Sequence, residues 1–116
     1  RGLDWPCPLV ADESCQGLDS LPGLVSIYDG VNIKLDKCGG VTEGLLMARQ
    51  ARRDGLMTMV GNMVGTSLSV APAFLLAQVC DFADLDSTTF IERDLSPSVV
   101  IEDGWLRVPS GLWGNL

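Results

Sequence analysis

The sequence predicts an α/β protein that forms half of a parallel barrel, and three observations lead to this fold class. Predicted strands alternate with predicted helices at a repeat of roughly 25–30 residues, which is typical of parallel βαβ units. The strands are near-continuous apolar runs, as strands covered on both faces are. Polar residues gather at the carboxyl end of each strand, where α/β barrels carry their active sites. Because an eight-stranded barrel needs about 250 residues, we expect this chain to be part of a longer protein.

The first two predicted strands are separated by a short turn or helix. Residues 9–12 form an apolar run that ends in an aspartate. Residues 16–24 contain two glycines and a proline, which favour a turn or a short helix. Residues 30–35 alternate aliphatic side chains with polar ones, which predicts a second strand, and the glycine pair at 39–40 stops it.

A helix, a third strand and a second helix are predicted next. Thr42 is the expected N-cap of a helix that runs through residue 53, and Gly55 is the left-handed residue that ends it. Residues 56–60 form an apolar strand. A helix over 70–79 follows, capped by an upstream serine, with Pro72 in its first turn, where proline is tolerated.

The last part of the chain departs from this alternation. Residues 82–85 form a fourth apolar strand, and residues 91–98 are polar, which indicates a loop. Two short strands, 99–101 and 105–108, are joined by Asp-Gly, a dipeptide typical of two-residue hairpin turns. We therefore expect a half barrel followed by a short β-hairpin and tail.

The composition narrows the classes of function. Hydrophobic residues make up 47% of the chain, a high share for a small domain, so we expect some of them to be buried against parts outside it. Acidic residues outnumber basic ones by 15 to 8 and no basic stripe is present, so nucleic acid is not an expected partner. The lack of histidine excludes Ser-His or Cys-His nucleophiles and histidine zinc sites within this chain.

The cysteines and the apolar runs bear on location. The four cysteines show no CxxC pairing, which is typical of reduced thiols in an intracellular protein. The opening residues lack the apolar core of a signal peptide, and the longest apolar stretch, 70–79, is too short to cross a membrane. The sequence thus predicts a cytoplasmic protein without a membrane partner.

Lys34 is the most informative residue of the predicted second strand. Strand periodicity places Asn32, Lys34 and Asp36 on one face, opposite Val31 and Ile33. A lysine among branched aliphatic residues either reaches water with its ammonium group or lies in a polar pocket. In such a pocket, burial lowers the pKa of the lysine and makes its free amine a proton acceptor. Both interpretations stay open on this pattern alone.

Carboxylates near two other strand ends could share that pocket. Mg²⁺ prefers hard oxygen ligands, and Asp12 is the best candidate, with Glu13 on the opposite face of a regular strand. Asp84 and Asp86 are two residues apart, so both project from one face and would form an anionic pocket suited to an ammonium group. Helix capping and loop structure are the alternative roles for these aspartates. The glycine-containing loop 61–67 can bring its backbone close to a ligand.

Four motifs in this order resemble the C-terminal part of the enolase superfamily: ADES at 11–14, NIKLDKCGG at 32–40, VGNMVGTS at 60–67 and DLD at 84–86. Within it, the chain is most similar to the dipeptide epimerases of the muconate-lactonizing-enzyme subgroup, the L-Ala-D/L-Glu epimerase type. The closing VPSGLWG fits the same resemblance. The resemblance implies a modified (β/α)₇β barrel of which residues 1–116 are the C-terminal part. The first barrel strands and a capping domain would lie upstream.

The resemblance assigns the chemistry to two residues of this chain. Asp12 matches a Mg²⁺ ligand and Lys34 matches one of two catalytic lysines, while the second lysine and the other ligands are expected upstream. The implied reaction is Mg²⁺-dependent epimerization by 1,1-proton transfer at a carbon next to a carboxylate. Lys34 would remove or return the proton on one face of that carbon.

The resemblance also assigns the contacts with substrate. Asn62 and Val64 match loop positions that touch substrate through their backbone, and Asp84 and Asp86 match the pair that holds the ammonium group of a dipeptide such as L-Ala-D/L-Glu. N-acylamino-acid racemase, o-succinylbenzoate synthase and muconate cycloisomerase are the alternatives within the superfamily, and none of their substrates carries a free ammonium. A non-catalytic barrel remnant is the alternative outside it. The remaining barrel and cap are expected partners, and a homo-oligomer stays open.

Overall fold

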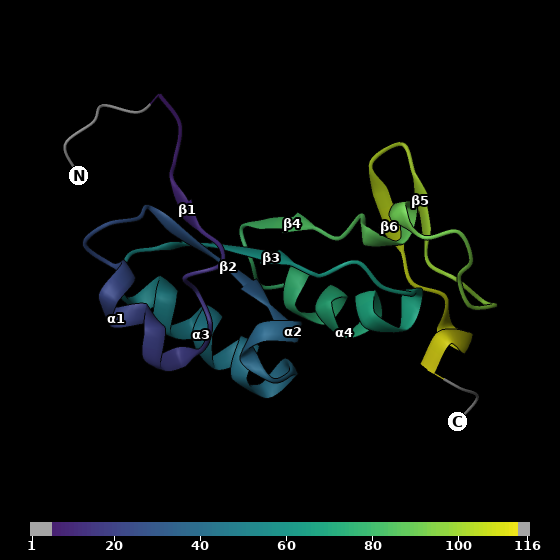
Figure 1. Cartoon of the computed structure of the whole chain (residues 1–116), viewed down its shortest axis with the longest axis horizontal. Coiled ribbons are helices and arrows are strands. Elements are labelled where there is room, and N and C mark those ends of the chain that lie inside the picture. Colours follow the sequence, from purple (N-terminus) through teal and green to yellow (C-terminus); the bar gives the residue numbers. More distant parts are fainter. Residues whose placement is uncertain (1–5, 114–116) are drawn as a thin grey trace.

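Four parallel strands lie side by side in chain order, β1-β2-β3-β4, in this computed structural model, which describes residues 6–113 (Figure 1). The strands are β1 (Val10–Ala11), β2 (Gly30–Lys34), β3 (Met57–Gly61) and β4 (Phe82–Asp84). In the register, Lys34 of β2 lies opposite Gly61 of β3, and Gly61 lies opposite Asp84 of β4. Successive parallel strands in chain order are what repeated βαβ units produce, so the predicted parallel α/β alternation is confirmed.

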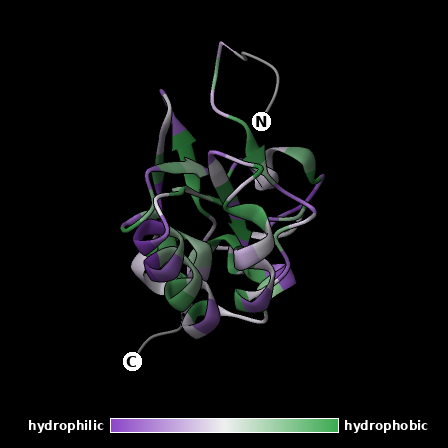
Figure 2. Cartoon of the chain, turned by 90° about the vertical axis from the view of Figure 1, so that its left-hand side faces the viewer, coloured by the Kyte–Doolittle hydropathy of each residue, from purple (hydrophilic) through white to green (hydrophobic). Residues whose placement is uncertain are grey.

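The main helices cover one face of this sheet (Figure 1). Helix α3 packs on β2 and β3, and α4 packs on α3 and β3. The core lies between them, where Ile33, Val60, Met47 and Leu76 are fully buried. The ribbon in Figure 2, coloured by hydropathy, shows hydrophilic residues on the helices as well as hydrophobic ones. Helix α3 is amphipathic, with its buried residues on the side that faces the sheet. The helical segments are η1 (Leu18–Ser20), α1 (Leu21–Leu24), α2 (Leu35–Cys38), α3 (Val41–Arg53), α4 (Ser67–Ala77), η2 (Ser87–Phe90) and η3 (Ser110–Trp113).

The segment between β2 and α3 differs from the prediction. Strand β2 ends at Lys34 and helix α2 starts at the next residue, so Asp36 lies on a helix and not on the strand face with Lys34. Helix α3 begins at Val41 with Gly40 as its N-cap, and the expected capping role of Thr42 is wrong. The physical reason is the glycine pair: Gly39 and Gly40 have φ angles of 91° and 128°, which let one short helix turn directly into the next.

The start of α4 also differs, because its cap comes from a distant loop. Asp94 accepts a hydrogen bond from the Ser67 amide at 2.8 Å and a second bond from the Ser67 hydroxyl. The Ser67 oxygen in turn accepts the amide of Val99 at 2.8 Å. Helix α4 therefore begins at Ser67, three residues earlier than predicted, and Pro72 lies inside it and not in its first turn. Burial disfavours the Asp94 anion, but these hydrogen bonds hold its pKa below the ordinary value.

The predicted hairpin at the end of the chain is present. Strands β5 (Val100–Glu102) and β6 (Trp105–Arg107) pair antiparallel. Asp103 and Gly104 connect them with φ angles of 51° and 78°, the two positive values that a tight two-residue hairpin turn requires. Asp and Gly are the residues that adopt this conformation at low cost, which is why the dipeptide was informative.

The cysteine and membrane expectations can be compared with residues 6–113. All four cysteines are free thiols, and burial raises the pKa of Cys15 and of Cys80. Within that range, no helix has the length and apolarity that a membrane span requires. Residues 1–5, on which the signal-peptide expectation depended, and Gly114 of the closing motif lie outside the described residues.

Asp81 is the polar anchor at the start of β4, and its removal should lower stability. Its Oδ2 accepts the amide and the hydroxyl of buried Thr58, both at 2.8 Å, and these bonds hold the pKa of Asp81 below its ordinary value. We expect Asp81→Ala to lower the free energy of unfolding of the full-length protein by about 1–3 kcal/mol, because two buried donors lose their acceptor. A group with a lowered folded pKa stabilises above its unfolded pKa of about 3.9 and loses that effect as pH falls through the folded value. Urea unfolding at pH 7 and pH 3 should therefore show a gap between parent and variant that narrows in acid. A gap that is equal at both pH values would contradict this role.

Candidate functional site

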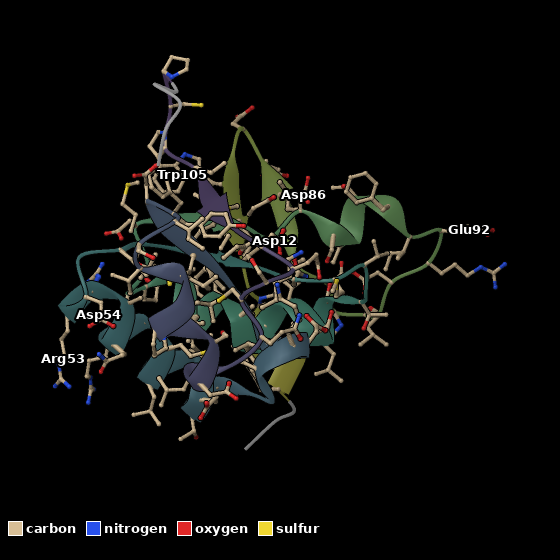
Figure 3. The ribbon with its side chains drawn as sticks, turned by 60° about the vertical axis from the view of Figure 1, so that its left-hand side comes forward. Asp12, Arg53, Asp54, Asp86, Glu92 and Trp105 are labelled. Atoms are coloured by element: carbon tan, nitrogen blue, oxygen red, sulfur yellow. The ribbon has the colours of Figure 1, made fainter. Side chains whose placement is uncertain are left out.

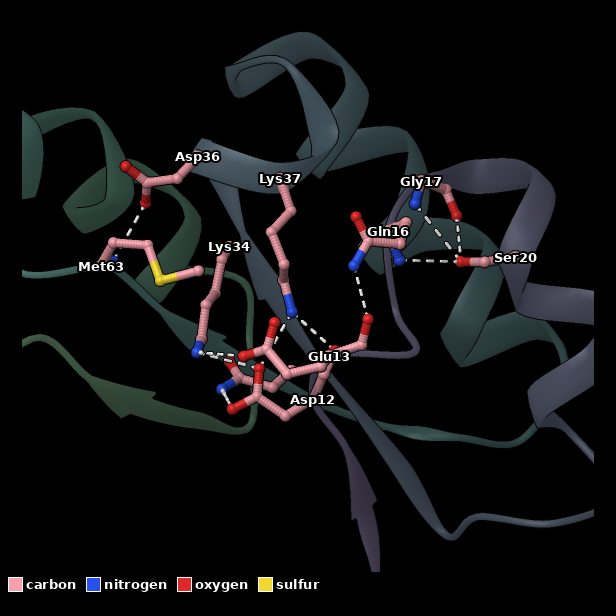
Figure 4. A network of polar contacts seen from close by, with 10 residues as sticks. Asp12, Glu13, Gln16, Gly17, Ser20, Lys34, Asp36, Lys37 and Met63 are labelled. Atoms are coloured by element: carbon pink, nitrogen blue, oxygen red, sulfur yellow. Dashed lines mark hydrogen bonds and ion pairs between the residues drawn. The ribbon is translucent and has the colours of Figure 1, made fainter.

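Asp12 and Lys34 meet at the carboxyl end of the sheet. Asp12 follows β1 directly and Lys34 is the last residue of the neighbouring strand β2, so the parallel arrangement carries both side chains to one edge. The Lys34 Nζ lies 2.9 Å from Asp12 Oδ1 (Figure 4). Lys34 of β2 is paired in register with Gly61 of β3, and Gly61 is paired with Asp84 of β4. Side chains that are in register on parallel strands point to the same face of the sheet, so Lys34 and Asp84 share a face. The structure thus brings these three predicted site residues to one edge of the sheet.

Lys37 is the residue of this cluster that sequence reasoning missed. It lies on α2, and its Nζ donates to the backbone oxygen of Asp12 at 2.6 Å and to Asp12 Oδ1 at 2.9 Å. Its side chain is only 6% exposed, which is unusual for a lysine without a specific partner. The available signal was the second lysine of the motif NIKLDKCGG, three residues after Lys34 and just past the predicted strand.

The charges of this cluster support one another. Burial disfavours the Asp12 anion, but hydrogen bonds from Lys37 and Lys34 outweigh it and hold the pKa of Asp12 below its ordinary value. Burial also disfavours the Lys34 cation, but Asp12 and Glu13 outweigh it and raise the pKa of Lys34. The lowered lysine pKa that one interpretation of the sequence implied is not found in this chain, where two carboxylates surround the ammonium group of Lys34. The expected direction of Glu13 is wrong, because regular strand geometry ends at Ala11 and Glu13 Oε1 lies 3.4 Å from Lys34 Nζ.

Asn32 is a buried polar residue next to the charged groups of the cluster. It is 5% exposed, and its Nδ2 donates to Asp12 Oδ2 at 3.3 Å. Its Oδ1 is buried without a hydrogen-bond partner among the described residues. Gly61 is required beside it, since a Cβ there would lie 2.9 Å from both Asn32 side-chain polar atoms. A buried, unsatisfied acceptor next to a carboxylate marks a place where a polar group or hydrated ion would fit.

The cluster fits part of a magnesium site. Asp12 offers a half-exposed hard carboxylate at a strand end, as this cation prefers, and the free acceptor of Asn32 lies beside it. Among residues 6–113, no group of three or more histidine, cysteine, aspartate or glutamate side chains could hold a metal ion. Asp12 is therefore the candidate ligand of this chain, and further ligands would have to come from outside the described residues.

The loop after β3 is tied to the loops on both sides. The Asn62 side chain donates to the Oγ of buried Ser87 at 2.5 Å, and the Met63 amide donates to Asp36 Oδ2 at 3.1 Å. Val64, at the tip, is exposed. Because the Asn62 side chain is engaged with Ser87, a contact of Asn62 with substrate would have to use its backbone. Asp36, which the sequence placed on the strand face, holds this loop instead.

Asp84 and Asp86 lie at the end of β4 and at the start of η2. Both side chains are exposed in this chain. Neither carboxylate has an ion-pair or hydrogen-bond partner in residues 6–113. Both residues line a cavity of about 370 Å³ between α4, β4 and the β5–β6 hairpin. Figure 3 shows Asp86 above the sheet, well away from Arg53 and Asp54 at the far end of α3.

These strand-end residues sit in a chain whose family can be identified. Residues 3–112 match the family described as enolase C-terminal domain-like. The chain belongs to this family. The predicted resemblance to the enolase superfamily is confirmed, and the four parallel strands are the C-terminal part of its barrel.

Two curated relatives in this family are racemases or epimerases. An N-acetyl-D-glutamate racemase from a Pseudoalteromonas species is 44% identical over 111 residues, which cover 95% of this chain and 35% of that protein. The L-Ala-D/L-Glu epimerase of Escherichia coli strain K12 is 42% identical over 103 residues, which cover 89% of this chain and 32% of that protein. The chain thus spans about a third of the length of the curated relatives it matches.

Two solved structures of family members contain ligands. An enolase family member from Agrobacterium tumefaciens with homology to dipeptide epimerases, with bound sodium and L-Ala-L-Glu, matches with a TM-score of 0.87 and 46% identity, over 96% of this chain and 34% of that one. A dipeptide epimerase from Methylococcus capsulatus, complexed with Mg and L-Arg-D-Lys, matches with a TM-score of 0.76 and 33% identity, over 86% and 30%. Metal ions and dipeptides are therefore ligands of these neighbours.

Proposed function

We propose that the full-length protein that contains this chain epimerizes dipeptides with a free amino group, by 1,1-proton transfer at the carbon next to a carboxylate. The observation that carries the proposal is that Asp12, Lys34 and Asp84 lie at the same edge of the sheet. A lysine that can exchange protons, a carboxylate that can ligate a cation and a carboxylate that can bind an ammonium group lie at the carboxyl ends of β2, β1 and β4 of one parallel sheet. The solved neighbours with bound dipeptides support the substrate class.

Residues 1–116 are then the C-terminal part of the barrel domain, and the first barrel strands and the cap lie outside them. The edge strands β1 and β4 have partners on one side only among the described strands, and apolar side chains such as Leu9 and Phe82 are exposed there. Paired edges would bury these groups. The second catalytic lysine and the other metal ligands belong to the same upstream part in this proposal.

Lys34 acts as acid and base on one face of the reacting carbon. Its Nζ is held at the sheet edge by Asp12 Oδ1, so it lies where a substrate bound at the strand ends would present its α-proton. Any cation ligated by the same oxygen weakens the ion pair that raises the pKa of Lys34, and this favours the neutral amine that a base requires. Magnesium, with Asp12 as the ligand from this chain, would supply positive charge that stabilises the substrate carboxylate while the α-proton is removed.

In this proposal, Asp84 and Asp86 bind the free amino group of the substrate. The backbone of Asn62 and Val64, in the neighbouring loop, contacts the substrate as well. Two carboxylates without partners among the described residues attract an ammonium group, and a cationic ligand relieves the repulsion between them. The racemase of N-acetyl-D-glutamate favours a second candidate, an N-acylamino-acid racemase, because that substrate lacks the ammonium group. The two candidate functions differ in the role of Asp84 and Asp86: the pair binds the ammonium group of a dipeptide, but an N-acylated substrate offers no such group.

Replacing both aspartates tests the substrate class directly. We expect the double variant Asp84→Asn, Asp86→Asn of the full-length protein to lose at least about tenfold in kcat/KM toward free-amine dipeptides, because a charge-assisted hydrogen bond contributes about 1.5–3 kcal/mol. Activity toward the N-acylated analogue should change much less. Mass-spectrometric reading of α-proton exchange in deuterium oxide measures both.

The matched control removes two charges elsewhere. Asp54→Asn with Glu92→Gln lowers the negative charge by the same amount, on the end of α3 and in the loop after η2, far from Asp12 in Figure 3. It should leave both activities unchanged. Equal losses toward both substrates in the Asp84, Asp86 variant would move the N-acylamino-acid racemase ahead, and activity toward neither class in the parent protein would favour a non-catalytic remnant.

A further inference from the structure

The chain contains two lysines, and the ammonium groups of both contact the same atom, Asp12 Oδ1. The ammonium groups of Lys34 and Lys37 each lie 2.9 Å from Asp12 Oδ1 (Figure 4). One ammonium group would balance the charge of one carboxylate. Two of them so close together repel each other, so the second requires a reason beyond charge balance. The other contacts of the two lysines supply that reason.

Lys34 and Lys37 hold Asp12 in different ways. Lys34 contacts carboxylates alone, Asp12 at 2.9 Å and Glu13 at 3.4 Å. Lys37 also donates to the backbone oxygen of Asp12 at 2.6 Å, so one ammonium group bridges the main chain and the side chain of a single residue. A ligand that takes Asp12 Oδ1 removes a main contact of Lys34 and one of the two contacts of Lys37. It leaves the bond between Lys37 and the Asp12 carbonyl in place.

The surroundings make this bridge rigid. Lys37 sits on α2 (Leu35–Cys38), which is closed by Gly39 in the left-handed conformation, so its Cα is held by the turn that follows β2. Its side chain is 6% exposed, against 12% for Lys34, and it reaches from α2 across to the end of β1. A buried side chain with two fixed acceptors loses little further freedom when a ligand binds beside it.

We propose that Lys37 is a positioning residue: it locks the backbone and the carboxylate of Asp12 in the orientation that ligates a divalent cation, and so leaves Lys34 free for proton transfer. The inference rests on the proposed function, because it takes Asp12 as a metal ligand. Partners that orient a ligating carboxylate typically change metal affinity by about 10–100-fold when they are removed. Lys37 differs from a simple counter-charge, whose removal would raise the affinity for a cation by relieving repulsion.

The test is magnesium binding, measured by isothermal titration calorimetry on the metal-free full-length protein. Lys37→Met keeps most of the side-chain volume and removes the donor and the charge. Lys37→Arg keeps the charge but cannot place one nitrogen on both acceptors. We expect Lys37→Met to lower magnesium affinity about tenfold or more, and Lys37→Arg to lower it as well. Met47→Ala, in the fully buried core of α3, is the control that lowers thermal stability without contacting Asp12; it should keep the parent affinity.

Each outcome decides the proposal. Parent affinity in both Lys37 variants, a higher affinity in Lys37→Met, or a loss no larger than that of Met47→Ala overturns it. If Lys37→Met does not fold, Lys37→Arg decides alone, because a charge effect predicts no loss there and a positioning role predicts one. Asp12→Asn in the same titration separates the two levels of argument. If that variant binds magnesium as the parent does, the proposed metal ligand is wrong; if it loses binding while the Lys37 variants do not, only the role of Lys37 is wrong.

Discussion

The Lys34→Ala variant of the full-length protein is expected to lose epimerization, because one face of the reacting carbon loses its acid-base group. General acid-base catalysis contributes about 10²–10⁴-fold, so the rate of α-proton exchange from the enantiomer that faces Lys34 should fall by about that factor. Exchange from the other enantiomer should survive, since the second lysine is untouched. Single-turnover exchange in deuterium oxide, started from each pure enantiomer, measures the two faces separately.

Arg53→Ala is the matched control for this loss of one positive charge. Arg53 lies at the end of α3, at the edge of the molecule and away from the central Asp12 in Figure 3, and the Arg53→Ala variant should exchange both enantiomers at the parent rates. If Lys34→Ala also exchanges both enantiomers normally, Lys34 has no part in catalysis, and its contacts with Asp12 and Glu13 are structural. Equal loss from both enantiomers would instead indicate damage to the common binding site.

The second large effect is expected from Asp12→Asn. The amide keeps the shape of the carboxylate but removes the negative charge that a hard divalent cation requires. We expect magnesium affinity to fall by about 100-fold or more, beyond the range found when a partner of a ligand is lost. The activity should then require far higher magnesium concentrations, and titration of activity and of binding should shift together.

Asp12→Asn also removes the acceptor that Lys34 and Lys37 share, so stability has to be measured beside affinity. Asp54→Asn is the control with the same change of charge at an exposed helix end, and it should bind magnesium as the parent does. Magnesium dependence that survives unchanged in Asp12→Asn would show that other residues hold the metal. A folded variant with parent stability and weak metal binding is the result that supports Asp12 as a ligand.

Much of the fold could be predicted from short-range patterns. The apolar runs around 10–11, 30–34 and 57–61 are strands because branched side chains suit a covered pleated surface, and their order in the sheet follows from the helices between them. Asp103 and Gly104 predicted the hairpin because only a few residues accept two successive positive φ values. Element ends were less reliable, as the starts of α3 and α4 show.

The sequence by itself determined the parallel α/β alternation, the placement of Asp12, Lys34 and Asp84 at strand ends, and the superfamily, because each depends on local periodicity or motif order. Only the tertiary structure decided what depends on distant partners. Asp94 caps α4 across 27 residues, Lys37 reaches the backbone of Asp12 from α2, and Glu13 turns toward Lys34. The pKa of Lys34 shows the same division: its apolar neighbours in sequence predict a lowered value, but the two carboxylates that folding brings to its ammonium group raise it.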